Sequence, residues 1–593
     1  MHCGEPLTVQ PLGRREFLQG VPLLTGGGLA IARPLGRTAG ARSADGEARP
    51  GPIGTEQTET IFPQSVASGD PTPTGVVLWT RVAPSHAEGG DRLWLQVAES
   101  EDFADPVVET YFSARLPSEE TGYTIKVDLD GHLAPGSTYW YRFVYDGTTS
   151  PVGRTRTAPE GDTDSLRFAA TTCTNPVEGR LNSLDRLAER DDLNAVFHHG
   201  DYIYEFGNDQ LDPPHECVTL QDYRRRYADY RSRPELAAAH RRHPWIVLPD
   251  DGDVVNGLWR ENASAHDEDE GSFETRRAAA LRAFHEWIPT RTPTGGPDAV
   301  SRTLPFGDLA DIVVADTRLY RDKPRAGEIV TIRAEGADDE DLQLLSEDQF
   351  DWLVESLSES GARWTLLLQQ EMLGHWGGPG APPVLPEAVA EQLGVRNDGN
   401  MFYGWSWNGY PAERRRFYSS LKRCGVDGLV SLAGDAHLSL ALELAEQPWE
   451  PTRYDPATGR GSLGIEFVVP SVSSVAFAEQ FGWPPRTLSK GLEAASLGAN
   501  PHHRYTEFDS KGYTILELTA ERARAEYWFV DTVQAESDDE FMAAALESDA
   551  GSDQLRLVEV NDPRVPGPLP SDAQDPSVFE LPEVLDPLDH PGH

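Results

Sequence analysis

Lysine is almost missing from this chain. Asp and Glu number 96 against 52 basic residues, of which only five are lysines, Lys126, Lys323, Lys422, Lys490 and Lys511. The net charge of −44 excludes a nucleic-acid-binding surface, because such surfaces gain affinity from basic side chains that release counterions. High salt would screen the self-repulsion, since the Debye length falls to ~3 Å at molar ionic strength. We therefore interpret this acidic, lysine-poor composition as that of a protein from a halophile. A GC-rich genome would explain the missing lysines but not the acid excess.

Cysteine is also scarce, with four residues in the chain. Cys3 lies in the N-terminal segment, which leaves Cys173, Cys217 and Cys424. This density excludes a disulfide framework, and an odd count leaves at least one cysteine unpaired. We expect that Cys217 and Cys424 could form one bridge and that Cys173 is a free thiolate.

Long apolar runs are absent too, so the sequence predicts no transmembrane segment, which would need ~20 apolar residues. The one short run, from Val21 to about Ala32, follows Gly13-Arg14-Arg15-Glu16-Phe17-Leu18 and resembles a twin-arginine (Tat) export signal. The alternative is an arginine pair before a chance apolar stretch. We predict a signal peptide at 1–42 and a linker at 43–60. The protein would then be secreted or held at the cell surface, with the Tat export machinery as a partner.

From 61 to 159 short apolar runs alternate at period two without a helical stretch. Aromatic and β-branched residues occupy the alternate positions, which is typical of an immunoglobulin- or fibronectin-like β-sandwich. The candidate strands are 75–81, 93–97, 123–127 and 139–145.

From 165 to 533 apolar strands alternate with amphipathic helices, which predicts an α/β domain. The candidate strands are 166–171, 195–199, 245–248, 311–315, 364–368, 428–432 and 464–469. Alternating runs at 512–518 and 524–530 predict a hairpin at a sheet edge. Residues 534–593 hold fifteen acidic residues against Arg556 and Arg564. This composition favours a mostly disordered or surface-draped tail.

Polar side chains follow several of these strands. Because the carboxyl ends of parallel strands meet at one edge of a sheet, we expect the following residues to share one crevice: Cys173, Asp201, Asp250, Asp316, Gln369, Asp435 and His437. Tyr204 follows Asp201 by three residues. A trivalent metal can hold such a phenol as phenolate although its free pKa is ~10. The alternative is an ordinary strand-to-helix turn.

A dinuclear site needs oxygen-rich ligands and one bridging carboxylate, for which Asp201 is the natural candidate. Asn256 could supply an amide oxygen. Asp435 and His437 are two residues apart on a predicted extended segment, so they can face the same side. A histidine at such a place is more often an ordinary hydrogen-bonded loop residue.

Taken in order, these segments resemble the alkaline phosphatase D (PhoD) family of secreted, calcineurin-like metallophosphoesterases, which are related to purple acid phosphatases. The resemblance runs from about Phe62 to Val533. It is carried by residues 62–71, 78–81, Cys173, 200–205, 222–224, 250–251 with Asn256, 316–321, 407–411 and 434–437.

The resemblance implies an αββα metallophosphoesterase sandwich behind the N-terminal β-sandwich. It implies Fe³⁺ and Ca²⁺ as cofactors, with ligands among Cys173, Asp201, Tyr204, Asn256, Asp435 and His437. Histidine and thiolate would favour the iron, whereas the oxygens of Asp201, Asn256 and Asp435 would favour calcium. Asp201, Asn256 and His437 would also serve catalysis. The implied reaction is hydrolysis of small organic phosphate monoesters, and of some diesters, by attack of a metal-bound hydroxide or oxide.

Two positions depart from the family pattern. The family usually reads Asp-Asp-His-Glu where this chain has Asp250-Asp251-Gly252-Asp253, so an imidazole is missing that could contribute ~10²-fold as an acid. Asn408 replaces a usual Asp. The alternatives are a phospholipase D-type phosphodiesterase, with 374–401 as a substrate-gating loop, and a catalytically weak surface protein.

Overall fold

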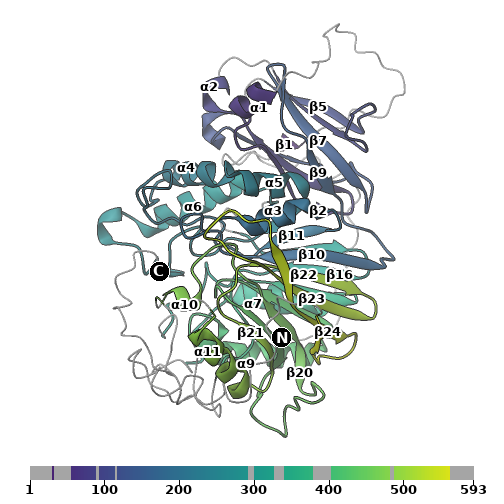
Figure 1. Cartoon of the computed structure of the whole chain (residues 1–593), viewed down its shortest axis with the longest axis vertical. Coiled ribbons are helices and arrows are strands. Elements are labelled where there is room, and N and C mark those ends of the chain that lie inside the picture. Colours follow the sequence, from purple (N-terminus) through teal and green to yellow (C-terminus); the bar gives the residue numbers. More distant parts are fainter. Residues whose placement is uncertain are drawn as a thin grey trace.

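The computed structural model describes residues 30–31, 55–87, 92–113, 117–291, 299–325, 339–377, 403–480, 482 and 486–560. Within these residues the strands form sheets of eleven, seven, five and two strands. The predicted signal peptide lies outside the described residues except at 30–31. The N-terminal region lies at the top of Figure 1, above the layers that carry the site.

Two sheets make up the N-terminal region. The five-stranded sheet contains β5 (Val108–Ser113), β4 (Arg92–Ala98), β7 (Thr138–Tyr145), β8 (Thr148–Thr149) and β9 (Gly153–Arg156). The eleven-stranded sheet begins with β1 (Ala30–Ile31), β6 (Thr124–Asp128), β3 (Gly75–Arg81) and β2 (Val66–Thr72). The four strands predicted in this region are therefore confirmed. One apolar cluster joins the two sheets, including Leu78 of β3, Leu95 of β4 and Tyr141 of β7. The short helices α1 (Thr55–Ile61) and α2 (Pro84–Ala87) flank them.

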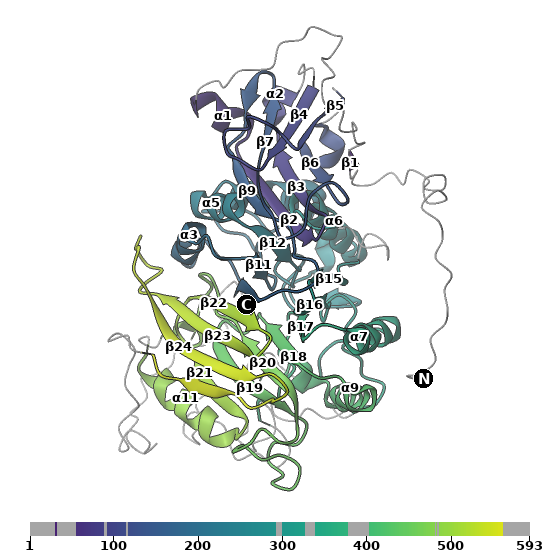
Figure 2. The same cartoon turned by 90° about the vertical axis from the view of Figure 1, so that its right-hand side faces the viewer.

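The eleven-stranded sheet continues without a break into the second region. It runs on through β12 (Pro244–Val247), β11 (Ala195–His198), β10 (Ser165–Thr171), β22 (Gly512–Thr519), β23 (Arg522–Val530), β24 (Glu540–Asp549) and β25 (Arg556–Val558). Figure 2 labels β12, β11, β22, β23 and β24 of this series in order from top to bottom. The junction is the parallel pair β2–β12, in which Ser68 lies opposite Pro244.

The seven-stranded sheet packs against this sheet. Its order is β15 (Arg302–Phe306), β16 (Ala310–Val314), β17 (Trp364–Leu368), β18 (Leu429–Ala433), β20 (Ser462–Val468), β19 (Ser439–Ala445) and β21 (His503–Glu507). Alternate side chains point to opposite faces of a strand. Phe197 of β11 and Leu366 of β17 therefore share the cluster between the sheets, whereas Val196 and Leu367 face outward.

Helices cover both outer faces. The eleven-stranded sheet carries α3 (Asn182–Glu189), α4 (Leu220–Arg231), α5 (Pro234–Arg242) and α6 (Phe273–Trp287). The seven-stranded sheet carries α7 (Glu347–Glu359), α9 (Pro411–Cys424) and α11 (Leu488–Ala499), with α10 (Phe477–Gln480) nearby. The layers are helix, sheet, sheet and helix, as an αββα sandwich requires. No helix among the described residues has the length and apolar character needed to cross a bilayer.

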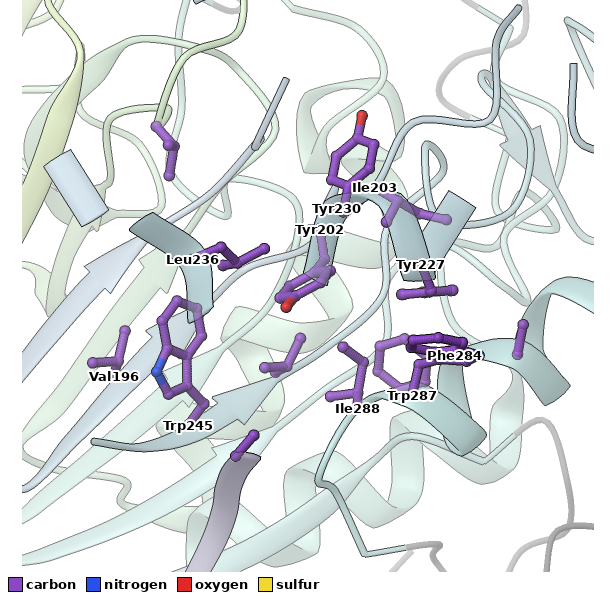
Figure 3. Packing of buried hydrophobic residues seen from close by; sticks show 14 of the residues in the cluster. Val196, Tyr202, Ile203, Tyr227, Tyr230, Leu236, Trp245, Phe284, Trp287 and Ile288 are labelled. Atoms are coloured by element: carbon purple, nitrogen blue, oxygen red, sulfur yellow. The ribbon is translucent and has the colours of Figure 1, made fainter. Parts of the chain in front are cut away.

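The loop after β11 is anchored in the outer apolar cluster shown in Figure 3. Tyr202 and Ile203 are fully buried there, near Tyr227, Trp245 and Trp287. Burying a large apolar side chain contributes about 1.5–3 kcal/mol. The residues on either side of this pair, Asp201 and Tyr204, are thereby held in place by packing rather than by a long flexible loop.

The prediction of a disordered tail from residue 534 is wrong for residues 540–558. β24 pairs along the whole of β23, and its residues Ala545 and Leu546 are fully buried. Its outward Glu547 pairs with Arg522 and Arg524. Composition averaged over sixty residues hides a short strand whose acidic side chains face outward. The 512–530 hairpin is consequently inside the sheet, not at its edge.

The suggested Cys217–Cys424 bridge is also wrong. Cys217 is a free, buried thiol in the cluster beneath α4, whereas Cys424 ends α9 in the opposite outer layer. The prediction that Cys173 is free is confirmed.

Candidate metal centre

The predicted site residues lie at the carboxyl ends of strands from both large sheets. Cys173 follows β10 and Asp201 follows β11, which is the parallel neighbour of β10. Asp435 and His437 follow β18 of the second sheet. The sheets meet beside them, where Thr172 forms a parallel bridge with Ser471. Residues far apart in the sequence thus converge at one place, as parallel strand ends do.

Four of these residues share an unusual backbone conformation. The φ angles of Cys173, Asp201, Asp435 and His437 are 55°, 54°, 61° and 53°, in the left-handed region that non-glycine residues rarely occupy. Such strain costs about 1–3 kcal/mol per residue, persists only where the surrounding structure enforces it, and is frequent at functional sites. Gly200 has φ 101°, and a Cβ there would lie 2.3 Å from Cβ of Asp250, so only glycine lets these two loops approach.

One cluster, which we call the mixed-donor group, consists of Cys173, Asp201, Tyr204 and His437. Candidate ligand atoms of Cys173, Asp201 and His437 lie within 4.8 Å of one another. The Tyr204 hydroxyl is 3.2 Å from Nε2 of His437 and 2.8 Å from the Ser474 hydroxyl. Nδ1 of His437 lies 2.9 Å from the Val475 carbonyl, which can only accept. Nδ1 therefore carries the proton, and Nε2 has its lone pair available for a metal.

A second cluster, the carboxylate group, consists of Asp201, Asp250, Asp251 and Asp435. Their oxygens also lie within 4.8 Å of one another. Asp201 belongs to both groups. All-oxygen donors suit hard cations such as Ca²⁺, whereas thiolate and imidazole suit transition metals. The residues present therefore fit two different cations that share one carboxylate.

Arg318 contacts the carboxylate group from the protein interior. Its side chain is 1% exposed, and its guanidinium pairs with Asp250 at 2.5 Å, Asp251 at 3.3 Å, Glu371 at 3.1 Å and also Asp435. Arg321 pairs with the same Glu371 at 2.9 Å. Five acidic side chains, counting Asp201, are therefore gathered around two guanidinium groups.

Burial raises the pKa values of the acidic site residues. Burial, with added repulsion from Asp201, raises the pKa of the Cys173 thiol and of the Tyr204 phenol well above their usual ranges. Burial and then the neighbouring carboxylates also raise the pKa of Asp201 well above its usual range. The pKa of Glu371 rises to about 8, chiefly because it is buried. Bound cations would stabilise all the deprotonated forms together.

Asn256 lies on the segment that follows these carboxylates. Its backbone N–H donates to Glu205 at 2.7 Å, and the next residue, Gly257, donates to Asp251 at 2.9 Å. These bonds fix the segment beside the carboxylate group. The role of the half-buried Asn256 amide as a metal ligand stays a prediction.

Gly252 occupies the position where the resemblance expects an imidazole. Its backbone N–H donates to Oδ1 of Asp201 at 2.9 Å. A Cβ at this position would lie 2.8 Å from the same oxygen and 3.0 Å from Cδ1 of Tyr204. Asp201 and Tyr204 therefore close the space around residue 252, and a side chain there would displace them.

His198, His199, His375 and His502, the other histidines expected near the site, are buried and contact groups that belong to neither ligand group. Nε2 of His198 is 3.0 Å from the Thr174 hydroxyl, and Nδ1 of His199 is 3.1 Å from the Gln369 carbonyl. Arg414 donates to His375, and His502 lies against the carbonyl of His375. Among the described residues, none of the four enters either ligand group.

Two predicted crevice residues have structural contacts instead. Asp316 accepts from the backbone N–H groups of Arg318 and Leu319, which closes the turn after β16. Gln369 accepts from the Trp407 indole at 2.9 Å. Three contacting residues were not singled out from the sequence: Arg318, Glu371 and Ser474. Arg318 lies in the stretch 316–321 that carried the resemblance, whereas Glu371 and Ser474 have no distinguishing pattern.

An αββα fold with two ligand groups at the strand ends defines the class of metallophosphoesterase-like proteins. The family model "PhoD-like phosphatase" matches residues 168–527, and "PhoD-like phosphatase, N-terminal domain" matches residues 46–159. The chain belongs to the PhoD-like phosphatase family. The resemblance found in the sequence is thus confirmed, and with it the assignment to the hydrolases that act on phosphoric esters.

Individual relatives agree with the family models. Alkaline phosphatase D of Bacillus subtilis (strain 168) is 31% identical over 536 residues, which covers 87% of this chain and 84% of that protein. A solved structure of PhoD aligns with a TM-score of 0.72 at 29% identity, covering 85% of this chain and 93% of that one. The likeness therefore includes both the N-terminal region and the site-bearing layers.

Proposed function

We propose that this chain hydrolyses phosphate monoesters, and some diesters, at a two-cation centre built from the mixed-donor and carboxylate groups. The observation that carries the proposal is the position of Asp201. Its carboxylate is common to a cluster with sulfur and imidazole donors and a cluster of carboxylates alone. A bridging carboxylate of this kind holds two cations close enough to act on one phosphate.

Formal charges support Fe³⁺ in the mixed-donor group and Ca²⁺ in the carboxylate group. Deprotonated Cys173, Asp201 and Tyr204 carry three negative charges beside a neutral His437, which suits a trivalent ion. Arg318 contacts four carboxylates, those of Asp250, Asp251, Glu371 and Asp435. Their four negative charges and the two positive charges of Arg318 and Arg321 sum to two negative charges. That balance suits a divalent ion with hard oxygen ligands, to which Asn256 would add an amide oxygen.

The residues of this chain position and neutralise the reacting groups. When bound, the cations would clamp phosphate oxygens and lower the pKa of the attacking water. The Ser474 hydroxyl positions the Tyr204 oxygen, and the Gly252 N–H fixes one oxygen of Asp201. Gly252 has no side chain that could protonate a leaving group. We therefore expect esters with good leaving groups to react fastest, because they need no acid.

The test compares p-nitrophenyl phosphate with bis-p-nitrophenyl phosphate on iron- and calcium-loaded protein in high salt. The expected result is monoester turnover that a chelator abolishes and that returns when both metals are restored. Chelator-resistant turnover, or none with either substrate, would contradict the proposal. Faster diester cleavage would favour the phospholipase D-type alternative. A phenyl phosphate control should react more slowly, since its leaving group is poorer.

We also propose that the protein is exported by the twin-arginine route. The support is the sequence at Arg14-Arg15 and the apolar run that follows. Replacing both arginines by lysine keeps the charge but should leave the enzyme inside the cell. The measurement is phosphatase activity in the cell interior against the exterior in the native host. Unchanged export of the lysine variant would rule out this route.

A further inference from the structure

Arg318 is the basic residue most closely engaged with the candidate metal centre. It contacts Asp250, Asp251, Glu371 and Asp435, and its side chain is almost completely buried. Three of these four residues, all except Glu371, belong to the carboxylate group. The guanidinium and a cation in this group would therefore share the same carboxylates.

Arg318 is poorly placed to bind a substrate phosphate. Arginine recognises phosphate through two parallel N–H groups of its planar fork. Here Nε lies 2.5 Å from an oxygen of Asp250 and one terminal nitrogen lies 3.3 Å from Asp251, while the other donates to Asp435 and lies 3.1 Å from Glu371. Each guanidinium nitrogen lies within 3.3 Å of a carboxylate oxygen of the protein, but Nε and the nitrogen near Asp251 make no hydrogen bond, so these contacts are mainly electrostatic. What Arg318 gives the site is one permanent positive charge, because guanidinium does not lose its proton in proteins.

We propose that Arg318 sets the valence of the cation that the carboxylate group accepts, favouring a divalent over a trivalent ion. The inference rests on the proposed function, since it requires a cation in this group. With Arg318 and Arg321 present, the four carboxylates that Arg318 contacts retain two negative charges, the charge of Asp201 being assigned to the mixed-donor group. Without Arg318 they retain three. The repulsion energy between Arg318 and a trivalent ion is 1.5 times that with a divalent ion at the same distance, because Coulomb energy scales with the product of the charges.

This selectivity would separate the two cations of the centre. The mixed-donor and carboxylate groups share Asp201 and adjoin each other, so a trivalent ion delivered to one could also enter the other. The guanidinium of Arg318 forms ion pairs with Asp250, Asp251 and Asp435 of the carboxylate group and with Glu371. Its burial keeps salt from screening the effect.

The test is competition between Tb³⁺ and Ca²⁺ on iron-loaded protein, followed by terbium luminescence in about 1 M salt to suppress surface binding. Asp435→Asn defines the signal that arises outside the carboxylate group. Arg318→Met should change the ratio of Tb³⁺ to Ca²⁺ affinity by roughly 100-fold in favour of Tb³⁺, at an effective dielectric constant of about 20. An unchanged ratio in this variant overturns the inference.

Two further variants separate charge from structure. Arg318→Lys keeps the charge with fewer contacts and should keep the wild-type ratio; a ratio like that of Arg318→Met overturns the inference. Arg224→Gln removes an arginine from a buried pair with Glu286, 2.6 Å apart between α4 and α6, and should leave the ratio unchanged. If wild type and Asp435→Asn bind Ca²⁺ alike, the proposed two-cation centre itself fails. If the two differ and only the ratio is insensitive to Arg318, this inference alone fails.

Discussion

Replacing Asp201 by asparagine is expected to lower the turnover of p-nitrophenyl phosphate by about 10³-fold, because one substitution removes a charged ligand from both groups. The change is nearly isosteric, and the amide can still accept the N–H of Gly252, which donates to Oδ1 of Asp201 at 2.9 Å. The fold should therefore persist while the metals are lost. The measurement is kcat/KM together with iron and calcium content per chain.

The matched control for this change is Asp70→Asn. Asp70 is equally buried, has a positive φ of 43° and pairs with Arg302 at 2.8 Å, but it lies on β2, away from both ligand groups. Its loss should lower thermal stability and leave metal content intact. Full metal content with full activity in Asp201→Asn would refute the bridging role. Equal losses of activity and metal content in Asp201→Asn and Asp70→Asn would point to misfolding instead.

A Tyr204 phenolate bound to Fe³⁺ would give the iron-loaded protein a visible charge-transfer band, and Tyr204→Phe is expected to remove this phenolate band while leaving any absorption from a Cys173 thiolate on the iron. The phenolate band would arise from charge transfer between the Tyr204 oxygen and iron, so it cannot survive when that oxygen is removed. The change deletes only a hydroxyl, which contacts Ser474 at 2.8 Å and His437 at 3.2 Å. The cost in stability should stay near ~1 kcal/mol. Absorbance between blue and red wavelengths, scaled to iron content, is the measurement.

Tyr202→Phe is the natural comparison, two residues earlier in the same loop. The Tyr202 hydroxyl is also buried, but it lies 2.8 Å from Nε2 of His240 and outside the mixed-donor group. This variant should keep the full band. Identical spectra for Tyr204→Phe and the wild type, or equal loss of the band in both variants, would show that Tyr204 is not the phenolate ligand.

Much of the fold could be predicted because its strands are short apolar runs bounded by turns. The runs at 195–199 and 364–368 correspond to β11 and β17, and the polar residues after such runs reach a common site. β24 could not be predicted in this way. Its burial depends on pairing with β23, and its acidic residues conceal the apolar face when composition is averaged.

The position of the candidate site was predictable where residues of ligand type follow strand ends, as at Cys173 and Asp201. It was not predictable where tertiary contact alone gives a residue its role. Glu371 follows β17 like many solvated glutamates, yet it is fully buried between Arg318 and Arg321. Likewise, the left-handed backbone of Asp435 and His437 differs from the extended segment expected, and no sequence pattern signals it.

The hydrogen-bonded pair β2–β12 joins the N-terminal region to the strands that carry the site. Trp79 of β3 reinforces the junction by donating to the backbone of Glu286 in α6 at 2.9 Å. An N-terminal module exchanged for one from another protein would have to present a strand in the same register, or β12 would become an exposed sheet edge prone to aggregation. The two regions are therefore not interchangeable building blocks, and recombination between them would be tolerated only among close relatives.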